Sequence, residues 1–181
     1  NQSQVLALVV GVLFFAIAMA TRRVYATALS ADEGTLRLAS DYLLWFIPSL
    51  ARQFGLVAMG SALRGTGNFR PGMVVQTATV ILNIVLAPVL IFGWGTGVAF
   101  GVAGAALSTL VAIAVGVVWM VVYFLPADAY LRFSIRDWKP RFDLWRDMLK
   151  IGLPAGAEFA LMAVYLMFVY AVSRPFGAAA Q

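Results

Sequence analysis

The residues best able to do chemistry are polar side chains that lie inside long apolar runs. Asn83 lies near the centre of one such run, and Thr79 and Gln76 precede it by about one and two helical turns on a related face. An amide buried in hydrocarbon costs free energy unless it is paired or faces water. Asn83 is therefore expected either to bind a cation or substrate in a cavity or to hydrogen-bond a neighbouring helix. Pro88, which is expected to bend this run, favours the cavity.

Two other runs carry strongly polar residues at positions where the membrane interior is expected. Arg52 and Gln53 lie near the middle of their run. A midplane arginine costs about 2.5 to 3.5 kcal/mol on insertion scales, so Arg52 should face water or a partner, or should snorkel to the headgroups. Glu158 lies four residues into the last run, about 6 Å deep. That depth suits a carboxylate in a cytoplasmic vestibule, or one that pairs with Lys150 at the interface.

The sequence offers little for an enzyme. It has no cysteine and no histidine, which excludes thiol nucleophiles, histidine bases and the commonest zinc ligands. The Walker A, HExxH and GxSxG patterns do not occur. We therefore expect no catalytic residue, no metal site and no cofactor. The net charge of +5 comes from basic residues in short connectors, which argues against nucleic-acid binding.

The composition predicts an all-α integral membrane protein, a polytopic bundle of transmembrane helices. Apolar residues make up 62% of the chain and charged residues 12%, against roughly 45 to 50% and about 25% in soluble domains. No charged residue occurs from Pro71 to Ala127, which is long enough for two membrane crossings. Gly, Pro and charge clusters separate five apolar runs, at about residues 4–20, 41–63, 72–92, 98–124 and 154–173.

The basic residues of the connectors predict the orientation of these runs. The connectors after the first and third runs lie on one side and hold Arg22, Arg23 and Arg37. The connectors on the other side carry more basic residues, namely Arg64, Arg70, Arg132, Arg136, Lys139, Arg141, Arg146 and Lys150. The positive-inside rule therefore places the connectors 64–71 and 125–153 in the cytoplasm.

Two further patterns concern packing and the last connector. Small residues at three- and four-residue spacing, Gly101, Gly104, Ala105 and Ser108, predict a close approach between two helices. The spacing of Phe142, Trp145 and Met148 among charged residues predicts a short amphipathic helix on the membrane surface.

Three ordered segments resemble a known transporter family. They are ALRGTGNFRPGM at residues 62–73, NIVLAPVLIFG at 83–93 and GVAGAALST at 101–109, and IGLPA follows at 151–155. Together they are similar to helices four to six, and the start of helix seven, of the multidrug and toxic compound extrusion (MATE) transporters. The resemblance implies twelve helices in two lobes, of which this chain would supply helices three to seven as a piece of a longer protein. It divides the chain into an N-terminal lobe (1–131), a cytoplasmic linker (132–153) and the first helix of the C-terminal lobe (154–181).

The resemblance also implies a function. Members of this family export organic cations and other drugs or metabolites in exchange for H⁺ or Na⁺, by alternating access between two lobes. The partners would be the bilayer of the plasma (inner) membrane, small organic cations and the missing helices. The expected pathway residues are Asn83, Ser108, Thr109, Gln53, Glu158 and Arg52. Many relatives have an aspartate in the first lobe where this chain has Ala87, and a sodium-coupled branch has an acid in the second lobe where this chain has Met162.

Two alternatives to a drug exporter stay open. A lipid-linked oligosaccharide or polysaccharide flippase of the same larger group would use Arg52 to hold a pyrophosphate. A non-transporting helical scaffold or truncated product would instead turn its midplane polar residues toward other helices, and it would contain no water-filled cavity.

Overall fold

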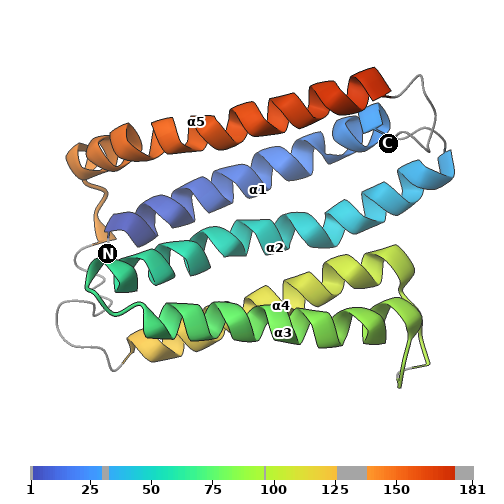
Figure 1. Ribbon diagram of the computed structural model, residues 1–181, viewed down its shortest axis with the longest axis horizontal. Coiled ribbons are helices and arrows are strands. Elements are labelled where there is room, and N and C mark those ends of the chain that lie inside the picture. Colours follow the sequence, from blue (N-terminus) through green and yellow to red (C-terminus); the bar gives the residue numbers. More distant parts are fainter. Residues whose placement is uncertain (1, 30–32, 96, 126–137, 174–181) are drawn as a thin grey trace. The chain divides into compact units, whose positions relative to one another are not determined.

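The computed structural model describes residues 2–29, 33–95, 97–125 and 138–173. It contains five long helices: α1 (Gln2–Leu29), α2 (Glu33–Gly65), α3 (Arg70–Phe92), α4 (Gly101–Phe124) and α5 (Phe142–Ser173) (Figure 1). Each has a stretch that is long and apolar enough to cross a membrane. These helices confirm the predicted class, a polytopic α-helical membrane bundle.

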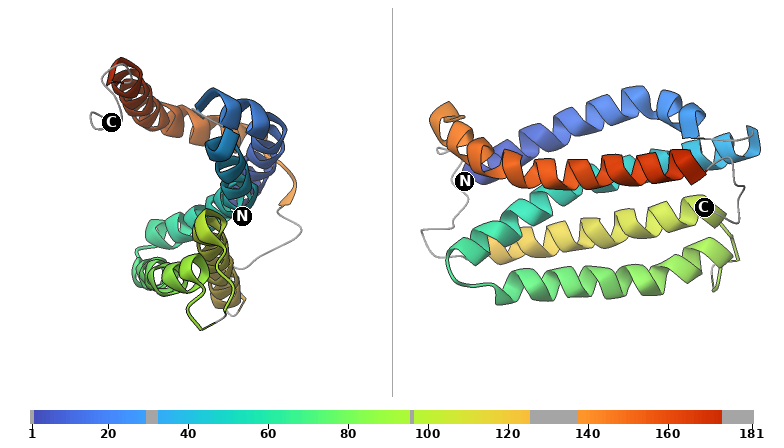
Figure 2. Two further views of the ribbon diagram at one scale, coloured as in Figure 1. Left: turned by 90° about the vertical axis from the view of Figure 1, so that its right-hand side faces the viewer. Right: turned by 45° about the horizontal axis from the view of Figure 1, so that its top comes forward.

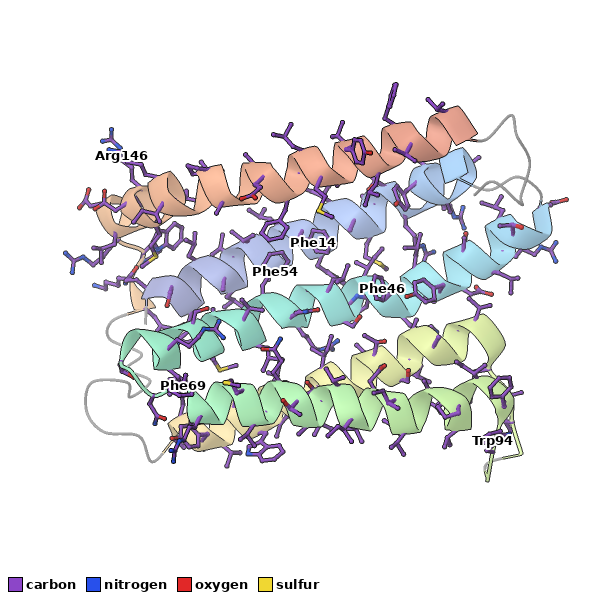
Figure 3. The ribbon with its side chains drawn as sticks, viewed as in Figure 1. Phe14, Phe46, Phe54, Phe69, Trp94 and Arg146 are labelled. Carbon is purple, nitrogen blue, oxygen red and sulfur yellow. The ribbon has the colours of Figure 1, made fainter. Side chains whose placement is uncertain are left out.

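The chain divides into two units, residues 1–140 and 141–181. In the first unit α2 is central, because it contacts α1, α3 and α4. Figure 2 shows α1 on one flank of α2, with α3 and α4 on the other. The rings of Phe14 on α1 and Phe54 on α2 meet with centroids 5.6 Å apart (Figure 3). Together with α4, these contacts hold α2 at the centre of the first unit.

The first two helices are longer than the apolar runs that predicted them. The first run was expected to end near residue 20, but α1 continues past Arg22 and Arg23 to Leu29. The second was expected to start near residue 41, but α2 starts at Glu33. A charged residue marks where the hydrocarbon layer ends, whereas a helix is free to continue into the headgroup region and water, where its polar side chains are solvated.

The connector between α3 and α4 begins with a glycine. Gly93 ends α3 with φ 73°, a left-handed conformation that favours glycine. The amide of Phe100 donates to the Leu90 carbonyl at 3.0 Å, which folds the connector back onto α3. A Cβ atom on Gly104 would lie 2.5 Å from the same carbonyl oxygen. This close approach confirms the predicted packing role for Gly104, whereas a Cβ on Gly101 would meet open space.

Buried apolar side chains cluster where α2 and α3 join and where α4 ends. They are Met59, Leu63, Val75, Met120 and Phe124. Elsewhere large apolar side chains are exposed; for example, Ile84 is 64% exposed and Val118 62%. In water such a surface would be unfavourable, so it fits contact with lipid or with other transmembrane helices.

The second unit contains α5, which runs from Phe142 to Ser173 through Pro154. The prediction of a separate amphipathic helix around Phe142, Trp145 and Met148 was wrong, since these residues form the first turns of the longer helix. A proline inside a helix removes one backbone hydrogen bond and bends the helix without having to end it. The division of the chain into lobes stays a prediction.

Candidate functional site: a polar cavity between α2, α3 and α4

Three helices of the first unit, α2, α3 and α4, line a cavity of about 470 Å³. This volume lies in the range of pockets that bind drug-sized molecules. Apolar residues form much of the wall, and the polar and charged lining residues are Gln53, Arg64, Gln76, Thr79, Asn83 and Thr109. A cavity with polar walls at this place favours a transport pathway over a purely structural scaffold.

Asn83 connects α3 to α4. Its Nδ2 lies 3.3 Å from Ser108 Oγ and 3.1 Å from Thr109 Oγ1. Both hydroxyls donate their hydrogen to the Ala105 carbonyl, at 2.8 and 3.1 Å. Because each hydroxyl has only one hydrogen, both must accept from Asn83, so the amide nitrogen faces α4.

The same amide also faces the cavity. Asn83 is a lining residue, and its Oδ1 accepts no hydrogen bond from any residue that the structure describes. Thr79 points its hydroxyl hydrogen at the Gln76 carbonyl, 2.7 Å away. The cavity therefore meets oxygen lone pairs at Asn83, Thr79 and Thr109, which suit a cation or an N–H donor. The two interpretations of Asn83 are thus compatible: the nitrogen joins two helices, and the residue also lines the cavity.

One face of α2 forms the opposite wall. Gln53, Val57, Gly60 and Arg64 recur at three- and four-residue spacing, so they share a face of the helix, and all four line the cavity. Arg64 folds back along α2 and donates from Nη2 to Ser61 Oγ at 2.9 Å. Gln53 thus lies where the sequence predicted, in the same cavity as Asn83 and Thr109.

Arg52 lies on a different face of α2 from its neighbour Gln53. It lines a second, mostly apolar cavity of about 630 Å³, which α1 and α2 form together with Val117, Val121 and Trp138. Its Nη1 donates to the Pro48 carbonyl at 3.3 Å, within the same helix. The structure therefore does not bring Arg52 together with the polar cavity.

The remaining predicted positions lie elsewhere. Ser108 is fully buried behind Asn83 and does not line the cavity itself. Glu158 is an exposed residue of α5, in the second unit. Ala87 is half-buried one turn after Asn83 and offers no titratable group there.

Sequence reasoning left three of the polar and charged lining residues out of the predicted site. Gln76 and Thr79 share a face with Asn83, but neither was named as a pathway residue. Arg64 was counted only as a charge that sets orientation. Its spacing from Gln53 along one helix face was the signal that could have placed it in the cavity.

A family model and the sequences of known proteins both show similarity to this chain. The MatE family model matches residues 1–89. The multidrug export protein MepA of Staphylococcus haemolyticus is 31% identical over 159 residues, which cover 87% of this chain and 34% of the relative. The chain thus spans about a third of the length of the curated relatives it matches.

Two solved structures share the fold. An outward-facing multidrug resistance transporter of the MATE family and the MOP superfamily has a TM-score of 0.78 and 27% identity, over 94% of this chain and 37% of its own. An inward-facing structure with a similar description has a TM-score of 0.74 and 26% identity, over 83% of this chain and 34% of its own. Helices and relatives together define a multi-pass membrane protein whose relatives are transporters rather than enzymes. The chain belongs to the MATE family of multidrug efflux transporters.

Proposed function

We propose that this chain is part of a secondary active antiporter that exports drug-like molecules or metabolites in exchange for H⁺ or Na⁺. The relatives that carry the name multidrug export protein support the substrate class. The fold occurs in both an outward-facing and an inward-facing transporter, which supports alternating access between two lobes. The missing helices would come from the rest of the same transporter.

The observation that carries the proposal is the orientation of Asn83. Its nitrogen is held by two hydroxyls on α4, and its oxygen accepts no hydrogen bond from the residues that the structure describes, in a side chain that lines the cavity. A preorganised acceptor in an apolar wall fits the cationic or N–H end of an organic substrate, and it fits a coupling cation equally well. Thr109 holds the nitrogen of this amide and also lines the cavity, and Gln53 adds a second amide across the cavity.

The proposed location is the inner membrane, with connectors 64–71 and 125–153 in the cytoplasm. Figure 3 shows Phe69, beside α3's first residue, and Trp94, just after its last, at opposite ends of the first unit. Arg64 and Arg70 lie at the end with Phe69. Their positive charge supports a cytoplasmic position for that end.

The test is efflux of a fluorescent organic cation from proteoliposomes that contain the intact gene product. An imposed H⁺ or Na⁺ gradient should drive efflux, and Asn83→Ala should abolish it. Asn68→Ala is the matched control, because Asn68 lies in the connector between α2 and α3, donates from its side chain to Tyr123 Oη at 3.4 Å and does not line the cavity. Folded protein that moves no substrate under either gradient would refute the antiporter.

One observation favours a second candidate, the lipid-linked oligosaccharide flippase. Arg52 lines the larger, apolar cavity, where a lipid chain would fit and the guanidinium would meet a phosphate. Undiminished lipid-substrate transport by Arg52→Ala would remove the reason for this candidate.

A further inference from the structure

The charge in the polar cavity sits at one end, next to Gly60. Besides its bond from Nη2 to Ser61, Arg64 has Nη1 4.0 Å from the place where a Cβ of Gly60 would be. Gly60 also lines the cavity and carries no side chain to cover the guanidinium. Across the cavity, a Cβ on Gly72 would lie 3.5 Å from the Gly60 Cα, so α2 and α3 approach each other at this level.

Within the described residues, Arg64 is the one ionisable side chain among those that line this cavity. It forms no ion pair there. The described acidic residues of the first unit are Glu33 and Asp41, both near the start of α2. Asp41 is about 35 Å from Arg64 along the helix axis, at about 1.5 Å per residue. The cavity therefore presents a guanidinium whose several donors are not matched by any carboxylate that the structure describes in this unit.

We propose that Arg64 is a specificity-determining residue that receives a carboxylate of the transported molecule at the cytoplasmic end of the cavity. This inference rests on the proposed export function and names a feature of its substrates. Asn83 lies about 16 Å along α3 from Gly72, so donor and acceptor ends of the cavity are well separated. A molecule with a carboxylate at one end and N–H donors toward the other matches both ends.

The competing explanation is that Arg64 only sets membrane orientation. Arg70 offers the matched control, because it begins α3 just after the end of α2, is exposed as Arg64 is, and does not line the cavity. A purely topogenic role would make Arg64→Gln and Arg70→Gln behave alike. A carboxylate receptor predicts that only Arg64→Gln changes ligand selectivity.

The experiment uses the purified intact gene product in a neutral detergent and two rhodamine dyes. One dye carries a free benzoate, and the other is its methyl ester, so that the pair differs only in the carboxylate. Equilibrium fluorescence anisotropy gives the ratio of the two dissociation constants for wild type, Arg64→Gln, Arg64→Lys and Arg70→Gln. Wild type should prefer the acid, and Arg64→Gln should reduce this preference about tenfold or more, the effect of losing a charge-assisted hydrogen bond. Arg70→Gln should keep the preference and Arg64→Lys should keep part of it.

Several results would overturn the proposal. Equal affinity of wild type for acid and ester, or no binding of the acid, overturns it without any variant. An unchanged ratio in Arg64→Gln, or the same change in Arg70→Gln, does so as well. Gradient-driven efflux of the ester in proteoliposomes tests the exporter separately. Efflux without a preference for the acid would support the export function and refute the carboxylate-binding role of Arg64. A preference for the acid without efflux would support that role of Arg64 and refute the export function.

Discussion

The close approach of α3 and α4 at Gly104 gives the sharpest prediction of the structure. A Cβ at this position would lie 2.5 Å from the Leu90 oxygen, 2.7 Å from the Leu90 carbonyl carbon and 3.0 Å from the Ile91 nitrogen. All three are backbone atoms, so no side-chain rotation can relieve the contact. Gly104→Ala must therefore push the two helices apart by several tenths of an ångström. Overpacking of this kind costs about 1 to 3 kcal/mol of unfolding free energy.

A glycine-to-alanine change also stabilises a helix independently of packing, and a control variant measures this second effect. Alanine in place of glycine in a helix stabilises by roughly 0.5 to 1 kcal/mol. Gly55 of α2 has no atom within 4 Å of its would-be Cβ, so Gly55→Ala should show this gain alone. The two variants should thus differ by about 1 to 3 kcal/mol, with Gly104→Ala the less stable.

The assay is reversible unfolding of the intact gene product in mixed micelles of increasing SDS fraction. Equal stability of Gly104→Ala and Gly55→Ala would refute the close approach of α4 to the α3 backbone. Greater stability of Gly104→Ala would refute it more strongly.

Three further predictions concern the site and the orientation. A double-mutant cycle of Asn83→Ala and Thr109→Val should give a coupling of about 0.6 to 2 kcal/mol in the same unfolding assay, and no coupling would contradict the bond between them. Arg52→Leu should favour insertion of the α2 segment by about 2.5 to 3.5 kcal/mol in a translocon glycosylation assay, since Arg52 meets a mostly apolar cavity. The chain has no cysteine, so single cysteines map its orientation directly: Asn68→Cys should react with an impermeant maleimide only in inverted vesicles and Gly95→Cys only in intact cells, and the reverse pattern would invert the topology.

Sequence alone came close to the ends of α3 because both are marked by backbone chemistry. Pro71 suits the first turn of a helix and Gly93 suits the residue that ends one, and the run between them is uncharged. The ends of α1 and α2 were missed because charge was the only marker there. For α5, Pro154 was taken as the start of a helix, although a proline can equally lie inside one.

To predict the partners of Asn83, one must know which residues of α3 and α4 lie at the same level. The pattern of apolar residues does not determine this register. The turn at Gly93 and the contact of Gly104 with Leu90 bring Ser108 and Thr109 to the level of Asn83. The sequence named all three as pathway residues, but only the packing shows that Ser108 supports the amide from behind while Thr109 also faces the cavity.

Arg52 and Arg64 show why charge is hard to interpret in a membrane sequence. Arg52 stands out because it lies deep in an apolar run, yet it meets an apolar cavity and a carbonyl of its own helix. Arg64 looks ordinary because positive residues gather at cytoplasmic helix ends in any case. In the sequence, an arginine that sets membrane orientation cannot be told from an arginine at the same position that binds a ligand. What separates them is the position of the side chain, which bonds Ser61 one turn back along α2, lies near Gly60 and lines the polar cavity.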